Sequence, residues 1–93
     1  MTRVYPTRWA AAAIDPHGRG ALILNLRTGT WTHLNPTAAA YWHTTIHHGL
    51  THQQALTELA DRYALAPAHL NADLAPLLEE LRTQRLVQTE DSP

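Results

Sequence analysis

Seven histidines are the side chains of this chain best suited to chemistry, and four of them lie close together. His43 and His47 are spaced so that one face of a helix would carry both, and His48 and His52 follow shortly after. A stable metal site needs three or four ligands whose orientation is held by further hydrogen bonds. No cysteine is available, and the acidic residues lie elsewhere. The pattern therefore favours a solvated helix face, and we predict no metal and no cofactor.

A catalytic nucleophile is equally hard to find in this sequence. The only serine is Ser92, in the C-terminal tail. Thr44 and Thr45 lie beside histidines, but no glycine-rich elbow or oxyanion site accompanies them. A phosphate-binding loop and a GxGxxG motif are also absent. We therefore expect a protein that is not an enzyme.

Length and composition limit the remaining classes. The 93 residues suit a single domain, which we expect to span 1–93 with a core over roughly 9–88. No apolar run approaches the roughly 20 residues that cross a bilayer, and no signal peptide pattern opens the chain. The net charge of −1 provides no attraction to nucleic acid or to a membrane surface. The absence of cysteine fits a reducing compartment, so we expect a cytoplasmic protein.

The elements that must position these residues are centred on one stretch, which reads GALILNLRTGTWTHLNPTAAAYW over residues 20–42. Alternating leucines predict a strand over 21–26. A three-residue turn over 27–29 follows, with Gly29 at the position that needs a positive φ. Residues 30–34 are rich in β-branched and aromatic side chains, which predicts a second strand.

An earlier strand is predicted over residues 9–14, although four consecutive alanines there favour a helix locally. The turn cluster at 15–20 decides for the strand, because a clear strand follows it. The result is a three-stranded antiparallel meander with residues 30–34 as one edge. Residues 1–8 are expected to be polar with few anchors, and residues 90–93 to be frayed.

Three helices are predicted after the sheet. Asn35 and Pro36 cap a first helix that reaches about His48. A capping box at 51–54 opens the second helix, and a break before Pro67 ends it. The third helix carries a leucine face, with a kink or a late start at Pro76. The predicted fold class is α+β, a winged helix-turn-helix in which three helices follow the three-stranded antiparallel sheet.

A helix-turn-helix raises the possibility of DNA binding. The third helix offers Asn71, Asp73, Glu79 and Glu80, with basic residues only at its end. DNA phosphates would repel the acidic side chains of this helix at physiological salt. A winged-helix transcriptional regulator is therefore the alternative function, and no nucleic-acid partner is predicted.

The edge strand carries the functional prediction. It has neither lysine nor proline to block pairing with another chain, so a peptide can add to it as a further strand. The competing interpretation is that Trp31 only covers the sheet, or that the third helix covers the edge. We expect Thr30, Thr32 and Leu34 to face the helices together with Leu22, Leu24 and Leu26, and Trp31 and His33 to face away. The predicted peptide-binding residues are Thr30, Trp31, Thr32, His33, Leu34, Leu70, Asp73, Leu74 and Leu77.

Several motifs in series resemble the PqqD-like family. They are GTWTHLN at 29–35, Trp42, Gly-x-Thr at 49–51 and Asp-Leu-x-x-Leu-Leu-x-x-Leu at 73–81. The resemblance covers roughly residues 18–87 and implies a recognition domain for ribosomally made, post-translationally modified peptides. It also implies that the leader region of a precursor peptide binds as an added strand on the third strand, against the third helix. Pro76 departs from the usual third helix.

Within that family, G-x-W-x-x-LN and Thr-x-x-x-Ala are most similar to the leader-binding B protein of split lasso-peptide systems. The resemblance implies two partners, a cysteine-protease-like leader peptidase and an ATP-dependent cyclase. The chain would then be a non-catalytic adaptor between precursor and enzymes. A domain in another peptide pathway, such as quinone-cofactor maturation, is a further possibility.

Overall fold

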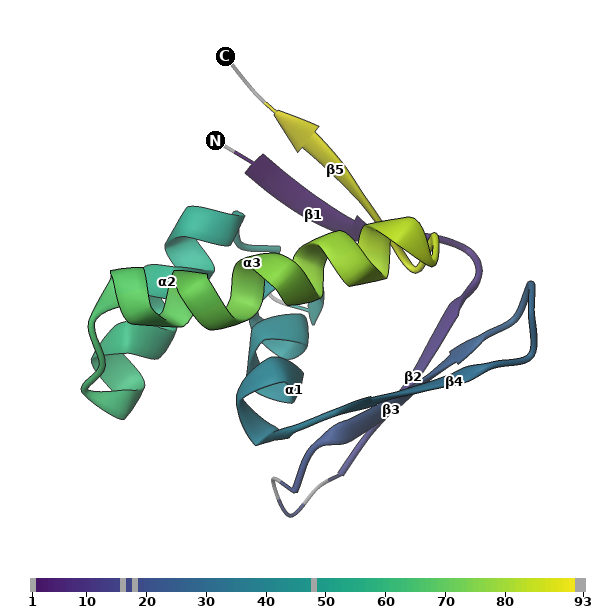
Figure 1. Ribbon diagram of the computed structural model, residues 1–93, viewed down its shortest axis with the longest axis horizontal. Helices are drawn as coiled ribbons and strands as arrows, with labels where there is room; N and C mark the ends of the chain where they lie inside the picture. The colour runs from purple at the N-terminus through teal and green to yellow at the C-terminus, as the bar shows by residue number, and fades with distance from the viewer. Residues whose placement is uncertain (1, 16, 18, 48, 92–93) are drawn as a thin grey trace.

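The computed structural model describes residues 2–15, 17, 19–47 and 49–91 and has the predicted α+β class (Figure 1). The predicted meander is confirmed as one antiparallel sheet in the order β2-β3-β4, and three α-helices follow it. No helix in the described part of the chain is long and apolar enough to cross a membrane. The elements are β2 (Ala10–Ile14), β3 (Ala21–Asn25), β4 (Trp31–Leu34), α1 (Pro36–Trp42), α2 (His52–Tyr63) and α3 (Pro67–Thr83).

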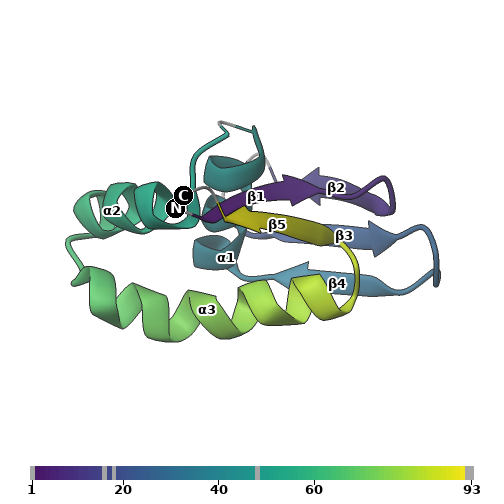
Figure 2. The same ribbon diagram turned by 90° about the horizontal axis from the view of Figure 1, so that it is seen from above.

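A second, two-stranded sheet joins the two ends of the chain (Figures 1 and 2). β1 (Thr2–Pro6) pairs antiparallel with β5 (Val87–Asp91), and Arg3 lies opposite Glu90. The strand β1 was not predicted, and the expectation that residues 90–93 are frayed was wrong for Glu90 and Asp91, while Ser92 and Pro93 lie outside the described residues. Val4 and Val87 are buried in the core, so apolar burial stabilises a pairing between segments too distant in sequence for a local pattern to reveal.

The register of β3 against β4 decides which side chains face the helices. Ala21 lies opposite Leu34, and Ile23 lies opposite Thr32. Directly opposite residues of an antiparallel pair share a face of the sheet. Ile23 and Leu34 are fully buried, so this is the face that packs against the helices.

The prediction that the β3 leucines face the helices was wrong. Leu22 lies opposite His33, and Leu24 lies opposite Trp31, so these four residues share the outer face. Leu22 is 42% exposed and Trp31 is 60% exposed. The alternation was predicted correctly, but alternation alone does not say which of the two faces is buried.

Asn25 closes the β3–β4 connection and ties it to α3. Its Oδ1 accepts hydrogen bonds from the backbone N–H groups of Arg27 (3.0 Å) and Thr28 (3.3 Å), while its Nδ2 donates to the Gln84 carbonyl (2.9 Å). The strand ends at Asn25 and β4 begins at Trp31, so the connection spans residues 26–30, two residues more than predicted. Gly29 has the expected positive φ, at 75°.

Side-chain caps begin the first two helices as predicted. Asn35 Oδ1 accepts from the Ala38 N–H (2.8 Å), and the capping box between Thr51 and Gln54 is complete. α1 continues into a π-helical segment, η1 (His43–His47), where the Thr44 and Thr45 hydroxyls donate to carbonyls one turn earlier. Such bonds compete with the regular backbone ladder and loosen it. The predicted helix end at His48 lies outside the described residues.

Pro76 neither interrupts α3 nor delays its start, because the helix runs from Pro67 to Thr83. Proline leaves the carbonyl four residues earlier, at Ala72, without its helical donor. Both residues are exposed, so water can satisfy that carbonyl. The opposite side of α3 buries Leu70, Leu74, Leu78 and Leu81, which confirms the predicted leucine face.

The core consists of two apolar clusters that meet at one residue. The first joins both sheets to α1 and the C-terminal half of α3. The second packs α2 against Tyr41 and the N-terminal half of α3. Leu77 packs against both clusters, so α3 connects the sheet to the helices.

A buried polar chain links the three helices around His52. The Tyr41 hydroxyl lies 2.6 Å from His52 Nδ1, and His52 Nε2 lies 3.0 Å from Asn71 Oδ1. The amide oxygen of Asn71 accepts, so Nε2 carries the proton and Tyr41 donates to Nδ1. Burial raises the pKa of Tyr41, which keeps this donor protonated. The expectation that His52 belongs to a solvated helix face was therefore wrong.

Substitution of Gly20 tests the packing of β3 against β4. Gly20 has φ of 128°, and a Cβ there would overlap the Leu34 carbonyl oxygen, whereas a Cβ at Gly29 meets nothing. We expect Gly20→Ala to lower the free energy of unfolding by more than about 2 kcal/mol and Gly29→Ala by about 1 kcal/mol. Urea unfolding measures both values, and equal losses would show that Gly20 does not sit against Leu34.

Removal of the Tyr41 hydroxyl tests the buried polar chain. We expect Tyr41→Phe to cost about 1–2 kcal/mol near pH 7, because His52 Nδ1 loses its partner in a buried site. The raised pKa of Tyr41 means that the unfolded state loses this proton first, so wild-type stability falls as the pH rises above about 10. Urea unfolding at pH 7 and pH 10.5 should show a smaller pH effect in Tyr41→Phe. An equal pH effect in both proteins would contradict this role for Tyr41.

Candidate functional site

A groove of about 520 Å³ runs between the β4 edge and α3, and the first turn of α1 closes one side of it. Figure 2 shows α3 lying alongside β4, on the side of the sheet away from β2. A volume of this size lies within the range of small-ligand and peptide side-chain sites. The groove is lined by His33, Leu34, Asn35, Thr37, Ala38, Leu65, Leu70, Asp73, Leu74 and Leu77.

The floor of the groove is apolar and its rim is polar. Leu34, Leu70 and Leu74 are almost fully buried and come from both sides, so sheet and helix share the floor. Asp73 is exposed at the rim, and its Oδ2 lies 3.9 Å from His69 Nε2. An apolar side chain entering the groove would therefore be desolvated, while a polar or basic group would stay near the carboxylate.

The free backbone groups of β4 lie on its outer edge, where His33 also lines the groove. The Asn25 N–H donates to the Thr30 carbonyl (2.8 Å), so this pair of residues is hydrogen-bonded across the turn. Bonded and non-bonded pairs alternate in an antiparallel ladder, so Thr32 and Leu34 also bond to β3. Trp31 and His33 consequently point their N–H and C=O groups outward. In the strand order β2-β3-β4, no described strand pairs with β4 on that side.

Thr32 faces the helices as predicted, and neither Thr30 nor Thr32 lines the groove. Thr30 precedes β4, and its backbone is engaged within the turn by Asn25 and by the Thr28 hydroxyl. Thr32 faces inward, where its hydroxyl donates to Gln84 Oε1 (2.8 Å). The structure thus brings together His33, Leu34, Leu70, Asp73, Leu74 and Leu77 in the groove, which Trp31 does not line.

Sequence reasoning missed several residues of this site. Asn35, Thr37 and Ala38 line it because α1 begins immediately after β4, and that direct junction was visible in the sequence. Leu65 lines it from the α2–α3 connection, where an exposed leucine before Pro67 was the available signal. Gln84 holds β4 to the end of α3 without lining the groove, and no local pattern pointed to it.

Structural hydrogen bonds occupy three of the side chains that we considered for catalysis or metal binding. Thr44 and Thr45 are buried and donate their hydroxyl protons to the Ala40 and Tyr41 carbonyls. His52 lies in the buried polar chain. Over residues 2–15, 17, 19–47 and 49–91, no group of three or more acidic, histidine or cysteine side chains is placed to hold a metal ion. His48 lies outside the described residues.

Comparison with known proteins identifies a family to which the chain is similar. No curated protein and no solved structure matches the chain significantly. The sequence model of one family, described as Coenzyme PQQ synthesis protein D (PqqD), matches residues 20–87. This range starts at Gly20 and contains β3, β4 and all three α-helices, and therefore both walls of the groove. The chain belongs to the PqqD family, whose domains recognise the precursors of ribosomally synthesised and post-translationally modified peptides.

Proposed function

We propose that this chain captures the leader region of a precursor peptide as an added strand on β4. The observation that supports the proposal is that His33, whose backbone faces outward, lines the groove with the apolar floor, while the outward-facing backbone of Trp31 lies two residues earlier on the same edge. An added strand places alternate side chains on the groove side, so one peptide can use the backbone edge and the floor together. Thr30 has no part in this proposal, because its backbone is engaged within the turn.

The energies of backbone hydrogen bonds indicate that the groove must contribute much of the binding free energy. Two outward-facing residues offer about four backbone hydrogen bonds, each contributing roughly 0.5–1.5 kcal/mol net. Micromolar binding requires about 8 kcal/mol, and ordering of the peptide must also be offset. Apolar anchors on Leu34, Leu70 and Leu74 are therefore needed. Pro76 does not disturb them, because it is exposed and does not line the groove.

The finer part of the proposal concerns the pathway. The motif resemblance to the B protein of split lasso-peptide systems supports a cytoplasmic, non-catalytic adaptor that presents the precursor to a cysteine-protease-like leader peptidase and an ATP-dependent cyclase. Such an adaptor needs an open edge and a separate surface for its enzymes rather than a catalytic centre. A precursor gene beside the gene for this chain would support this assignment.

The winged-helix DNA-binding alternative gains no support from α3. Its exposed side carries Asp73, Glu79 and Glu80, and Arg82 Nη1 forms an ion pair with Glu79 Oε1 at 2.8 Å. A recognition helix would instead direct basic and amide groups towards phosphates and bases.

Titration of the ¹⁵N-labelled protein with the leader peptide encoded beside it tests the capture site. We expect the largest amide shifts at Trp31 and His33 and along the α3 residues of the groove, because these groups change partners or surroundings. The α2 surface and the β1–β5 sheet should shift little. Absence of shifts at high micromolar peptide would rule out capture of that peptide, and binding to duplex DNA would then be measured by the same method.

Two substitutions separate the edge from the groove. His33→Pro removes an outward donor but no bond to β3, so we expect about tenfold weaker leader binding with little loss of stability. Leu74→Ala should weaken binding by about tenfold or more, because it removes part of the groove floor.

Leu78→Ala is the matched control for Leu74→Ala, because Leu78 is buried on the same helix but does not line the groove. Both variants should lose comparable stability in urea unfolding, whereas isothermal titration should show weaker binding only for Leu74→Ala. Equal affinities in the two folded variants would remove the groove from the proposal.

A further inference from the structure

The three-stranded sheet has a second free edge, at β2, which the capture of a leader does not use. The Leu26 N–H donates to the Trp9 carbonyl (2.8 Å) and the Asp15 N–H to the Gly20 carbonyl (2.9 Å), so both ends of the β2–β3 ladder are bonded pairs. By alternation, Ala11 and Ala13 bond to β3. Ala12 and Ile14 therefore direct their N–H and C=O groups away from the sheet, on the side where no described strand pairs. Ala10 directs its carbonyl the same way, but its N–H already donates to the Thr7 carbonyl (3.3 Å).

This edge lacks the features that usually prevent pairing between strands. β2 contains no lysine, no proline and no charged side chain, and its register with β3 is uninterrupted. Alanine is a poor strand former, so intrinsic preference does not explain the run of four. Ala12 shares the helix-facing side with Ile23 and is nevertheless exposed, so no helix covers the middle of β2. Helices approach the edge only towards Ile14, which shares a pocket with residues of α1 and α2 among the described residues.

We propose that β2 pairs with β2 of a second copy of this chain, antiparallel and centred on Ala12. In this register Ala12 lies opposite Ala12 of the second copy, and Ala10 lies opposite its Ile14. In this register the free N–H and C=O groups of the two edges meet and form four backbone hydrogen bonds, two at the Ala12 pair and one at each Ala10–Ile14 pair. A twofold axis through Ala12 relates the copies, so the contact is self-complementary and closes as a dimer.

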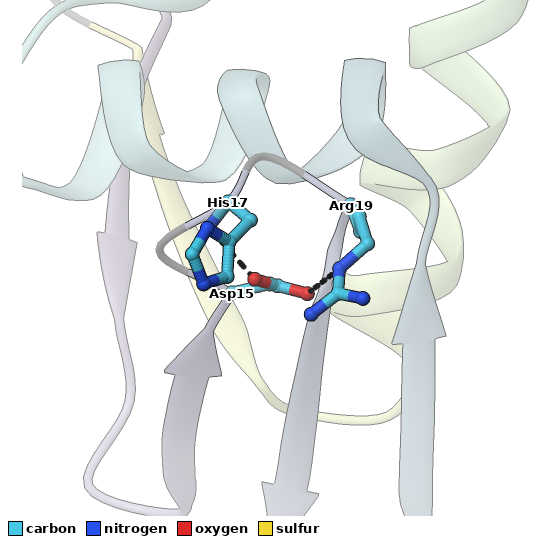
Figure 3. A network of polar contacts seen from close by, with 3 residues as sticks. All are labelled: Asp15, His17 and Arg19. Carbon is cyan, nitrogen blue, oxygen red and sulfur yellow. Dashed lines mark hydrogen bonds and ion pairs between the residues drawn. The ribbon is translucent and has the colours of Figure 1, made fainter.

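The charges at the two ends of β2 favour a second copy over an unrelated strand. Arg8 precedes the strand, and its guanidinium lies 4.6 Å from the centre of the Trp9 ring. Asp15 follows the strand and already binds Arg19 (2.8 Å) and the His17 N–H (2.8 Å), as Figure 3 shows. The proposed register places Trp9 opposite Asp15 of the second copy. An arginine and an aspartate therefore approach each other at both ends of the interface.

The dimer has one continuous sheet of six strands, with a β4 edge at each outer end. Both leader-binding grooves stay open, so this proposal does not depend on the proposed function. One strand from each copy makes a small interface, so we expect weak self-association with a dissociation constant of roughly 10–100 µM.

Sedimentation equilibrium of the full chain from 5 µM to 1 mM tests the dimer. We expect a reversible monomer–dimer equilibrium that Ala12→Pro and Ala12→Lys each weaken at least about tenfold. The proline removes an outward donor, and the lysine places two ammonium groups opposite each other at the twofold axis. Ala68→Lys, on the exposed surface of α3, is the charge-matched control and should leave the equilibrium unchanged. His33→Pro, at the β4 edge, should also leave it unchanged.

Circular dichroism first establishes that each variant is folded, and amide exchange at 1 mM adds an independent measurement. Slower exchange of the Ala12 and Ile14 amides than at 5 µM would support the β2 interface. A mass of one chain up to 1 mM would overturn the proposal. So would a dimer that survives both Ala12 variants, or one that His33→Pro disperses, because the contact would then lie elsewhere or at β4.

Discussion

The hydrogen bonds between Gln84 and the sheet are the interaction on which the groove depends. Gln84 ends α3, and it accepts from Asn25 through its backbone carbonyl and from Thr32 through its side chain. Asn25 and Thr32 belong to neighbouring strands, so one residue fixes the end of the helix against both. Asn25 is buried, and its side-chain oxygen and nitrogen both form hydrogen bonds. Loss of the contact with Gln84 would therefore leave an unpaired polar group in the core.

The other end of α3 is held by the polar chain through Asn71, His52 and Tyr41. Between these two attachments, Leu77 packs against both apolar clusters. The helix that forms one wall of the groove is thus fixed at both ends and in the middle. A groove that is already formed requires little rearrangement when a peptide enters, which lowers the ordering cost of binding.

The two edges of the sheet differ in their surroundings rather than in their backbone chemistry. β4 lies beside α3 and the start of α1, so a strand added there also meets an apolar groove. At β2 the alanine side chains leave a flat backbone surface along most of the strand, with pockets at its Ile14 end and opposite charges beside its two ends. A flexible leader needs anchors for its side chains, whereas a rigid second copy needs only matching hydrogen bonds and charges.

Much of this architecture was predictable from local sequence patterns. The positive φ of Gly29, the caps at Asn35 and Thr51, and the leucine face of α3 each depend on neighbouring residues, and each was predicted correctly. The sequence alone also pointed to β4 as an open edge and to Leu70, Leu74 and Leu77 as its neighbours. Tertiary structure decided which face of β3 is buried, that the chain ends pair as β1 and β5, and that Gln84 holds the groove. These features depend on contacts between segments far apart in the chain, and the energy of such contacts leaves no periodic signal in either segment.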